Sequence, residues 1–135
     1  MEGYQGPLPT PTPETKPFWD GLKDGRLLIQ RCITCAQAYF YPRPFCPSCF
    51  GWNVEWFEAS GKGKLYSFVI NYRPPPSMGT KPYVLAVVEL EEGPRMMTNL
   101  VGVEPDPSKI QCDAPVMIEY NAVTSEITLP KFHLI

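Results

Sequence analysis

The four cysteines at positions 32, 35, 46 and 49 constrain the fold of this chain more than any other feature. They form two Cys-x₂-Cys pairs that are separated by ten residues. In a tight turn, two cysteines with this spacing direct both sulfurs at one ion. Two such turns supply the four tetrahedral ligands that zinc prefers. The spacing therefore predicts one metal site, with the ligands Cys32, Cys35, Cys46 and Cys49.

Zinc, one ion per chain, is the expected metal, and iron is the alternative because the same four thiolates bind it equally well. Four protein ligands leave no open coordination position, so the ion is expected to be structural. The segment Met1–Tyr4 has neither the basic stretch nor the apolar run of a secretory signal. We therefore expect a cytoplasmic protein in which the cysteines are reduced and the fifth one, Cys112, is a free thiol.

Proline makes up 17 of the 135 residues, against a usual share of about 5%. This composition favours short strands and turns over long helices. One short helix is expected over residues 16–23, with an apolar stripe of Phe18, Trp19 and Leu22 and an end at Gly25. A helix this short is not stable alone, so its stripe should pack on the ribbon or on a partner subunit.

The remainder of the chain is typical of β-structure. Strands are expected over residues 54–58, 64–72, 83–90, 95–101, 116–120 and 127–134. Alternation in the second of them would place Tyr66, Phe68, Ile70 and Tyr72 on one face. Five or so antiparallel strands with a bent first one favour an OB-type Greek-key barrel.

The predicted fold is therefore mainly β, in three parts. An N-terminal arm and helix covers residues 1–26, a zinc ribbon residues 27–53, and a five-stranded OB-fold barrel residues 54–135. No apolar run reaches the length of about 18 residues that a transmembrane helix needs. We expect no association with a membrane.

The residue types needed for catalysis are scarce. The chain has one histidine, His133, and one cysteine outside the ribbon, Cys112, which lies in a loop with Asp113 and Pro115. A nucleophile without a neighbouring base is weakly reactive. The short Gly61–Lys64 segment precedes a strand and not a helix, which argues against a phosphate-binding loop. We expect no catalytic residue and no enzyme activity of the chain on its own.

The loop over residues 73–81 is a candidate binding segment. Arg73 and Lys81 lie at its ends, three prolines extend its start, and Met78 offers an adaptable apolar side chain. No acid occurs between Glu58 and Glu89, so this basic segment could meet the phosphates of coenzyme A. An ordinary solvated surface explains the same pattern.

The order of several motifs resembles the family known as domain of unknown function 35 (DUF35). Besides the cysteine quartet, the matching stretches are Pro17–Leu22, Tyr41–Pro44, Ser60–Phe68, Pro82–Ala86, Leu90–Arg95 and Asn99–Gly102. The resemblance implies a rubredoxin-like zinc ribbon joined to an OB-fold. One departure is Ala36, which stands where such zinc turns usually have glycine.

The resemblance also implies a function. Members are similar to small accessory subunits of thiolase-like enzymes, including thiolase-fold aldolases that shorten steroid side chains, and some are fused to or paired with hydratases. It implies a hetero-oligomer with a thiolase-like or aldolase subunit, contact with acyl-CoA, and a role in steroid or lipid degradation. The tentative ligand- or partner-binding residues are Phe18, Trp19, Arg73, Met78 and Lys81.

Two other functions stay open at this stage. One is a stand-alone acyl-CoA-binding protein. The other is a single-stranded nucleic-acid module that stacks bases on the aromatic row of residues 66–72. The net charge of −2 and the presence of Ile70 in that row favour core packing over nucleic-acid binding.

Overall fold

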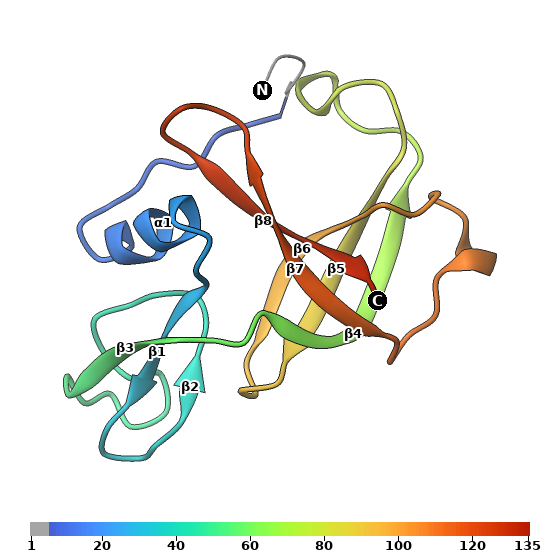
Figure 1. Cartoon of the computed structure of the whole chain (residues 1–135). Coiled ribbons are helices and arrows are strands. Elements are labelled where there is room, and N and C mark those ends of the chain that lie inside the picture. Colours follow the sequence, from blue (N-terminus) through green and yellow to red (C-terminus); the bar gives the residue numbers. More distant parts are fainter. Residues whose placement is uncertain (1–5) are drawn as a thin grey trace.

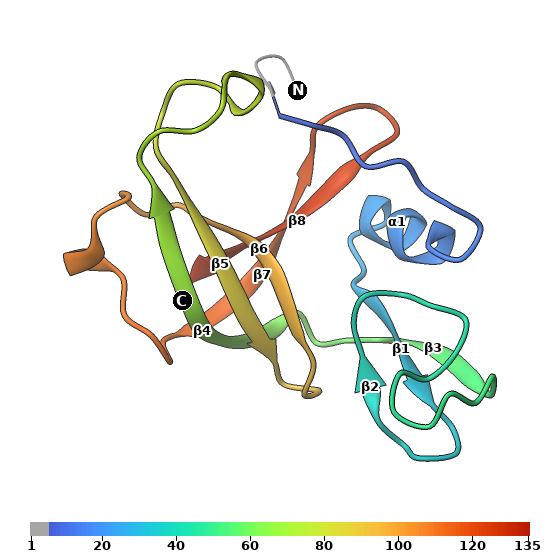
Figure 2. The same ribbon diagram turned by 180° about the vertical axis from the view of Figure 1, so that it is seen from behind.

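A short helix, a three-stranded sheet and a closed five-stranded barrel follow one another along the chain in this computed structural model, which describes residues 6–135 (Figure 1). The helix and the small sheet lie side by side at one flank of the barrel in both views (Figures 1 and 2). The expected fold, mainly β with a zinc ribbon and an OB-type barrel, is confirmed. Within residues 6–135, no helix has the length and hydrophobicity needed to cross a bilayer.

Helix α1 has the bounds that the sequence predicts, Lys16–Lys23. Proline in its first turn suits the start of a helix, and Gly25, with φ of 71°, ends it by donating its N–H to the Leu22 carbonyl. Phe18 and Leu22 are each 1% exposed. The apolar stripe of α1 is thus buried within the chain itself.

The small sheet has β1 (Leu28–Cys32) at its centre, between β2 (Ala38–Tyr39) and β3 (Val54–Glu58), and both neighbours are antiparallel to it. Strand β3 was expected to open the barrel, but it pairs with β1 along its whole length, from Cys32↔Val54 to Leu28↔Glu58. An ion pair of 2.8 Å between Arg31 and Glu55 joins these two strands. The division of the chain into three domains stays a prediction.

The barrel closes in the order β4-β5-β6-β8-β7. Its neighbouring strands were expected to be antiparallel, but β6 and β8 run parallel, with Leu100 opposite Phe132. The reason is topological, because five strands in a closed ring cannot all alternate in direction. The barrel strands are β4 (Lys62–Asn71), β5 (Tyr83–Leu90), β6 (Arg95–Val101), β7 (Pro115–Ala122) and β8 (Thr128–Leu134).

A bulge in β4 changes which of its side chains face the core. The register with β5 shifts between Leu65 and Ser67, so the alternation expected over residues 64–72 is interrupted. Tyr66 and Tyr72 are 45% and 59% exposed, whereas Phe68 and Ile70 pack against the core. The four residues therefore do not form one aromatic face, and that expectation was wrong.

One hydrophobic core joins the three structural parts. It includes Phe18 of α1, Ile29 of β1 and Phe132 of β8, all almost fully buried. The Phe18 ring lies 5.5 Å from the Phe40 ring and 5.8 Å from the Tyr41 ring, both of the ribbon. The helix thereby connects the ribbon to the barrel.

Gly63 tests the tight packing of β4 on β5. A Cβ at this position would meet the carbonyl oxygen of Glu89 on β5, which cannot move aside as a flexible side chain could. We expect Gly63→Ala to lower the free energy of unfolding by about 1–3 kcal/mol, the usual cost of overpacking. Urea unfolding measures the change. Ser67→Ala, an exposed site on the same strand, is the matched control, and an equal effect of both substitutions would contradict the packing argument.

Candidate metal centre and adjoining groove

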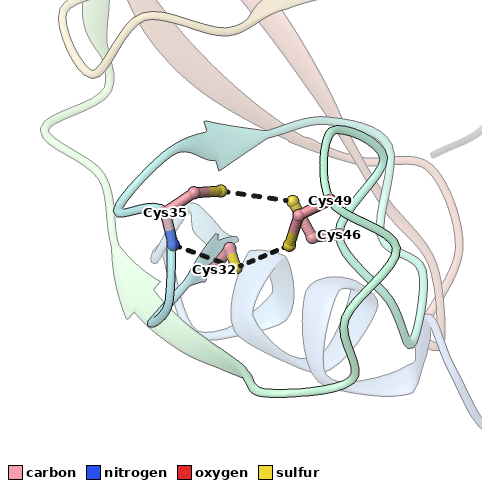
Figure 3. Close-up of side chains that lie close together, drawn as sticks. All are labelled: Cys32, Cys35, Cys46 and Cys49. Atoms are coloured by element: carbon pink, nitrogen blue, oxygen red, sulfur yellow. Dashed lines mark hydrogen bonds between the residues drawn. The ribbon is translucent and has the colours of Figure 1, made fainter.

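The four ribbon cysteines converge on one point (Figure 3). Their sulfurs all lie within 4.8 Å of one another. The Cys32 and Cys49 sulfurs are 3.7 Å apart, and those of Cys35 and Cys46 are 3.5 Å apart. Tetrahedral Zn–S bonds of about 2.3 Å require S···S distances of about 3.8 Å. The donor set and its spacing fit one tetrahedral zinc ion.

Two equivalent turns carry these cysteines. The N–H of Ala36 donates to the Cys32 carbonyl, and the N–H of Phe50 donates to the Cys46 carbonyl, each at 2.8 Å. Both residues have left-handed backbones, with φ of 60° for Ala36 and 62° for Phe50. Glycine adopts this conformation most easily, so neither turn has its preferred residue. A left-handed backbone at a residue other than glycine costs each turn about 1–2 kcal/mol of conformational energy.

Backbone N–H groups aim at the first sulfur of each pair. The Cys35 N–H donates to the Cys32 sulfur at 3.5 Å, and the Ser48 N–H donates to the Cys46 sulfur at 3.3 Å. Hydrogen bonds from the backbone of Cys49 and Ser48 lower the pKa of the Cys46 thiol to about 6. Hydrogen bonding to the Cys32 and Cys46 sulfurs raises the pKa of Cys35 to about 12. A metal ion would therefore displace protons from this site as it binds.

The two other residues considered for catalysis, Cys112 and His133, lie outside the ribbon. Cys112 is a free, exposed thiol in the loop between β6 and β7. His133 is on β8, where its Nδ1 lies 3.1 Å from Glu119 Oε1 of β7.

A groove of about 1010 Å³ adjoins the ribbon. Phe18 and Trp19 of α1 and Phe40 and Tyr41 of the ribbon contribute to its lining. The remaining lining residues come from Gly6 and Pro7, the 79–84 segment, β6 and the loop that follows it, Asn121 of β7, and β8. The volume is at the upper end of the range for small-molecule sites.

Within residues 6–135, no aspartate or glutamate lines the groove, although Lys81 and Lys131 do. Lys131 Nζ donates to Asn99 Oδ1 at 2.6 Å, and Asn99 Nδ2 donates to the Val84 carbonyl at 3.1 Å. Burial lowers the pKa of Lys131. Sequence reasoning missed this lysine. Its one available signal was that Lys131 precedes the core residue Phe132 in a strand, which places its side chain outside the barrel core.

The structure places the other tentative binding residues as follows. Phe18, Trp19 and Lys81 line the groove, whereas Arg73 is exposed and outside its lining. The side chain of Met78 lies outside what the structure describes. The indole N–H of Trp19 is buried without a hydrogen-bond partner among the described residues. A role of these residues in binding stays a prediction.

Cys46→Ser tests the metal centre. We expect wild-type protein to hold one zinc ion per chain and this variant to lose it, together with ordered ribbon structure, because metal binding and ribbon folding share one free energy. Metal analysis and a ¹H–¹⁵N NMR spectrum measure both effects. Cys112→Ser is the matched control and should keep the ion. Zinc retained in full by Cys46→Ser would contradict the four-thiolate site.

Comparison with known proteins places both halves of the chain in one family. Residues 19–55 match the domain described as "ChsH2, rubredoxin-like zinc ribbon domain", and residues 56–121 match "ChsH2, C-terminal OB-fold domain". The expected cofactor, a structural zinc ion, is thus supported by the family as well as by the thiol geometry.

Individual relatives agree with this placement. A solved chain titled "Ltp2-ChsH2(DUF35) aldolase" is 37% identical, with a TM-score of 0.82 over 94% of this chain and 98% of that one. "Benzoylsuccinyl-CoA thiolase subunit BbsA" of Thauera aromatica is 33% identical over 85% of both chains.

A third relative is longer. "Probable enoyl-CoA hydratase alpha subunit" of Thermomonospora curvata is 42% identical over 85% of this chain. The match covers only 36% of that protein. The zinc ribbon, the barrel and these relatives together show that the chain belongs to the DUF35 family of ChsH2-type zinc ribbon and OB-fold proteins.

Proposed function

We propose that this chain is a non-catalytic accessory subunit, which binds a thiolase-like acyl-CoA enzyme and completes the entrance to its active site. The enzyme would be a thiolase or a side-chain-cleaving aldolase of lipid or steroid degradation. The observation that carries the proposal is the similarity over nearly full length to the ChsH2(DUF35) chain of an aldolase structure. The similarity to a thiolase subunit over 85% of both chains supports the same class of partner.

The chemistry of the described residues supports a non-catalytic role. A zinc ion held by four thiolates has no position for a substrate or a water molecule. The single histidine lies beside Glu119, and Cys112 lies in a different loop from the four ribbon thiols. The bond-breaking step would therefore belong to the partner. The hydratase relative does not alter this proposal, because the match leaves most of that protein uncovered.

The groove supports a contribution to acyl-CoA binding. Its apolar and aromatic lining suits an acyl chain, and its two lysines suit the anionic parts of the ligand. A stand-alone acyl-CoA-binding protein is the alternative that the same groove favours. The nucleic-acid function has less support, because Phe68 and Ile70 face the core and the Tyr66 ring is covered by the Arg95 guanidinium, 3.8 Å from its centroid.

Co-expression with a thiolase-like acyl-CoA enzyme tests the accessory role. We expect the two proteins to co-purify as a hetero-oligomer, and the enzyme to lose most of its activity when this chain is omitted. Light scattering and assays with and without the chain measure these effects. A chain that binds acyl-CoA but ignores every thiolase-like candidate would instead support the stand-alone carrier.

The basic ends of the 73–81 loop provide a second test. If they meet the phosphates of coenzyme A, replacing Arg73 and Lys81 by alanine should raise the KM of the complex for its CoA substrate about three- to tenfold, as expected for partly exposed charge-assisted contacts. The matched control replaces Lys23 and Lys109, which are also exposed. An unchanged KM and unchanged assembly would mean that the loop only connects β4 to β5.

A further inference from the structure

Lys131 is a charged side chain at an apolar site. It lies on β8 and lines the groove, as do Leu129 and Met96, and none of the described residues that line the groove is acidic. This is unusual in a chain whose acids outnumber its lysines and arginines by 14 to 12. An ammonium group that is partly removed from water is costly unless a counter-charge compensates it.

No such counter-charge is present among the described residues. Glu119 lies opposite Lys131 in the register of β7 and β8, but its carboxylate lies 3.1 Å from His133 Nδ1, and it forms no ion pair with Lys131. Within the part of the chain that the structure describes, the one polar side chain that contacts the Lys131 ammonium is Asn99. An amide oxygen accepts a hydrogen bond but leaves the charge unneutralised.

The ammonium group is nevertheless held in place. Asn99 is itself fixed, because its Nδ2 donates to the Val84 carbonyl while its Oδ1 accepts from Lys131. One of the three N–H donors of Lys131 is used in this contact, so two remain. The arrangement is a positioned cation with free donors at the wall of an apolar groove, whose lining also includes Leu100 and Leu129.

We infer that the groove binds an apolar molecule that carries a carboxylate, and that Lys131 contacts this carboxylate. The inference deepens the proposed function, because it assigns the class of acyl group that the complex handles: acyl groups with a free carboxylate in addition to the thioester. In this respect it rests on the proposed function. The lowered pKa of Lys131 agrees with this, because an anion would restore the charged form that burial disfavours.

A carboxylate fits better than a phosphate for a reason of charge. Lys131 is a single cation, and Lys81, the other lysine of the groove, is exposed on the 79–84 segment. A phosphate monoester carries about two charges at pH 7. Two remaining N–H donors and one positive charge match the two oxygens and single charge of a carboxylate.

Binding of three eight-carbon probes to the isolated, zinc-loaded full-length chain tests the inference. The probes are octanoate, octanamide and octyl phosphate, which share one apolar tail and differ in the head group. Titrations are followed by ¹H–¹⁵N NMR. We expect octanoate to bind at least about tenfold more tightly than octanamide, as expected when a hydrogen-bonded ion pair is lost. Equal affinities, or no binding of octanoate at millimolar concentration, would overturn the inference.

Variants assign the effect to Lys131. Lys131→Met should reduce octanoate affinity to that of octanamide, and Lys131→Arg should retain a preference for octanoate. Lys62→Met, an exposed position outside the groove lining, is the matched control and should leave both affinities unchanged. Discrimination that survives in Lys131→Met would show that another group recognises the anion. Octyl phosphate binding tenfold more tightly than octanoate would overturn the carboxylate assignment.

A second measurement needs no substitution. Uniform ¹⁵N labelling leaves the three N–H donors of each lysine in place, and a ¹H–¹⁵N spectrum selective for side-chain ammonium groups detects the Lys131 Nζ signal. On addition of octanoate, the Lys131 signal should move most. A Lys131 signal that stays still while octanoate binds would overturn the inference. Neither test includes a partner enzyme, so failure to find a partner and failure to bind a carboxylate are separate results.

Discussion

The packing of Phe18 is the interaction on which the arrangement of the three parts depends. Its ring contacts Phe40 and Tyr41 of the ribbon edge to face, and it belongs to the core that includes Phe132 of β8. A helix of eight residues has little stability by itself, so α1 persists because burying its stripe contributes about 1.5–3 kcal/mol per large side chain. The helix in turn gives the ribbon a fixed position beside the barrel.

The metal centre and the groove are linked through this packing. Strand β2 has only two residues, and hydrogen bonds of Tyr39 and Gln30 to the Arg43 backbone also hold the segment that carries Phe40 and Tyr41. A metal ion on the four thiolates would stabilise the ribbon further. The rings of Phe40 and Tyr41 form part of the groove together with Phe18. A zinc ion with four thiolate ligands has no open coordination position for a substrate. Its role would be structural: it would help to fix the ribbon wall of the groove, while the barrel strands fix the other wall.

Local patterns in the sequence predicted the local structure well. The spacing of the cysteines indicated a common metal site, and a stripe of three apolar residues before Gly25 gave the bounds of α1. Features that depend on long-range pairing were missed. Val54–Glu58 has the pattern of any half-buried strand, so the sequence did not indicate its pairing with β1. The bulge after Leu65 placed Tyr66 on the other face of β4 from the one expected. Lys131 was missed because Asn99, its partner, is 32 residues away and is brought near by the parallel pairing of β6 with β8.

A structure of this chain in complex with a thiolase-like enzyme, at a resolution that shows side chains, tests the central claim most directly. The account predicts that the groove between α1, the ribbon and the barrel opens onto the entrance of the partner's active site, with Phe18 still buried inside this chain. A complex in which the partner covers another face and the groove points away from its active site would contradict the account.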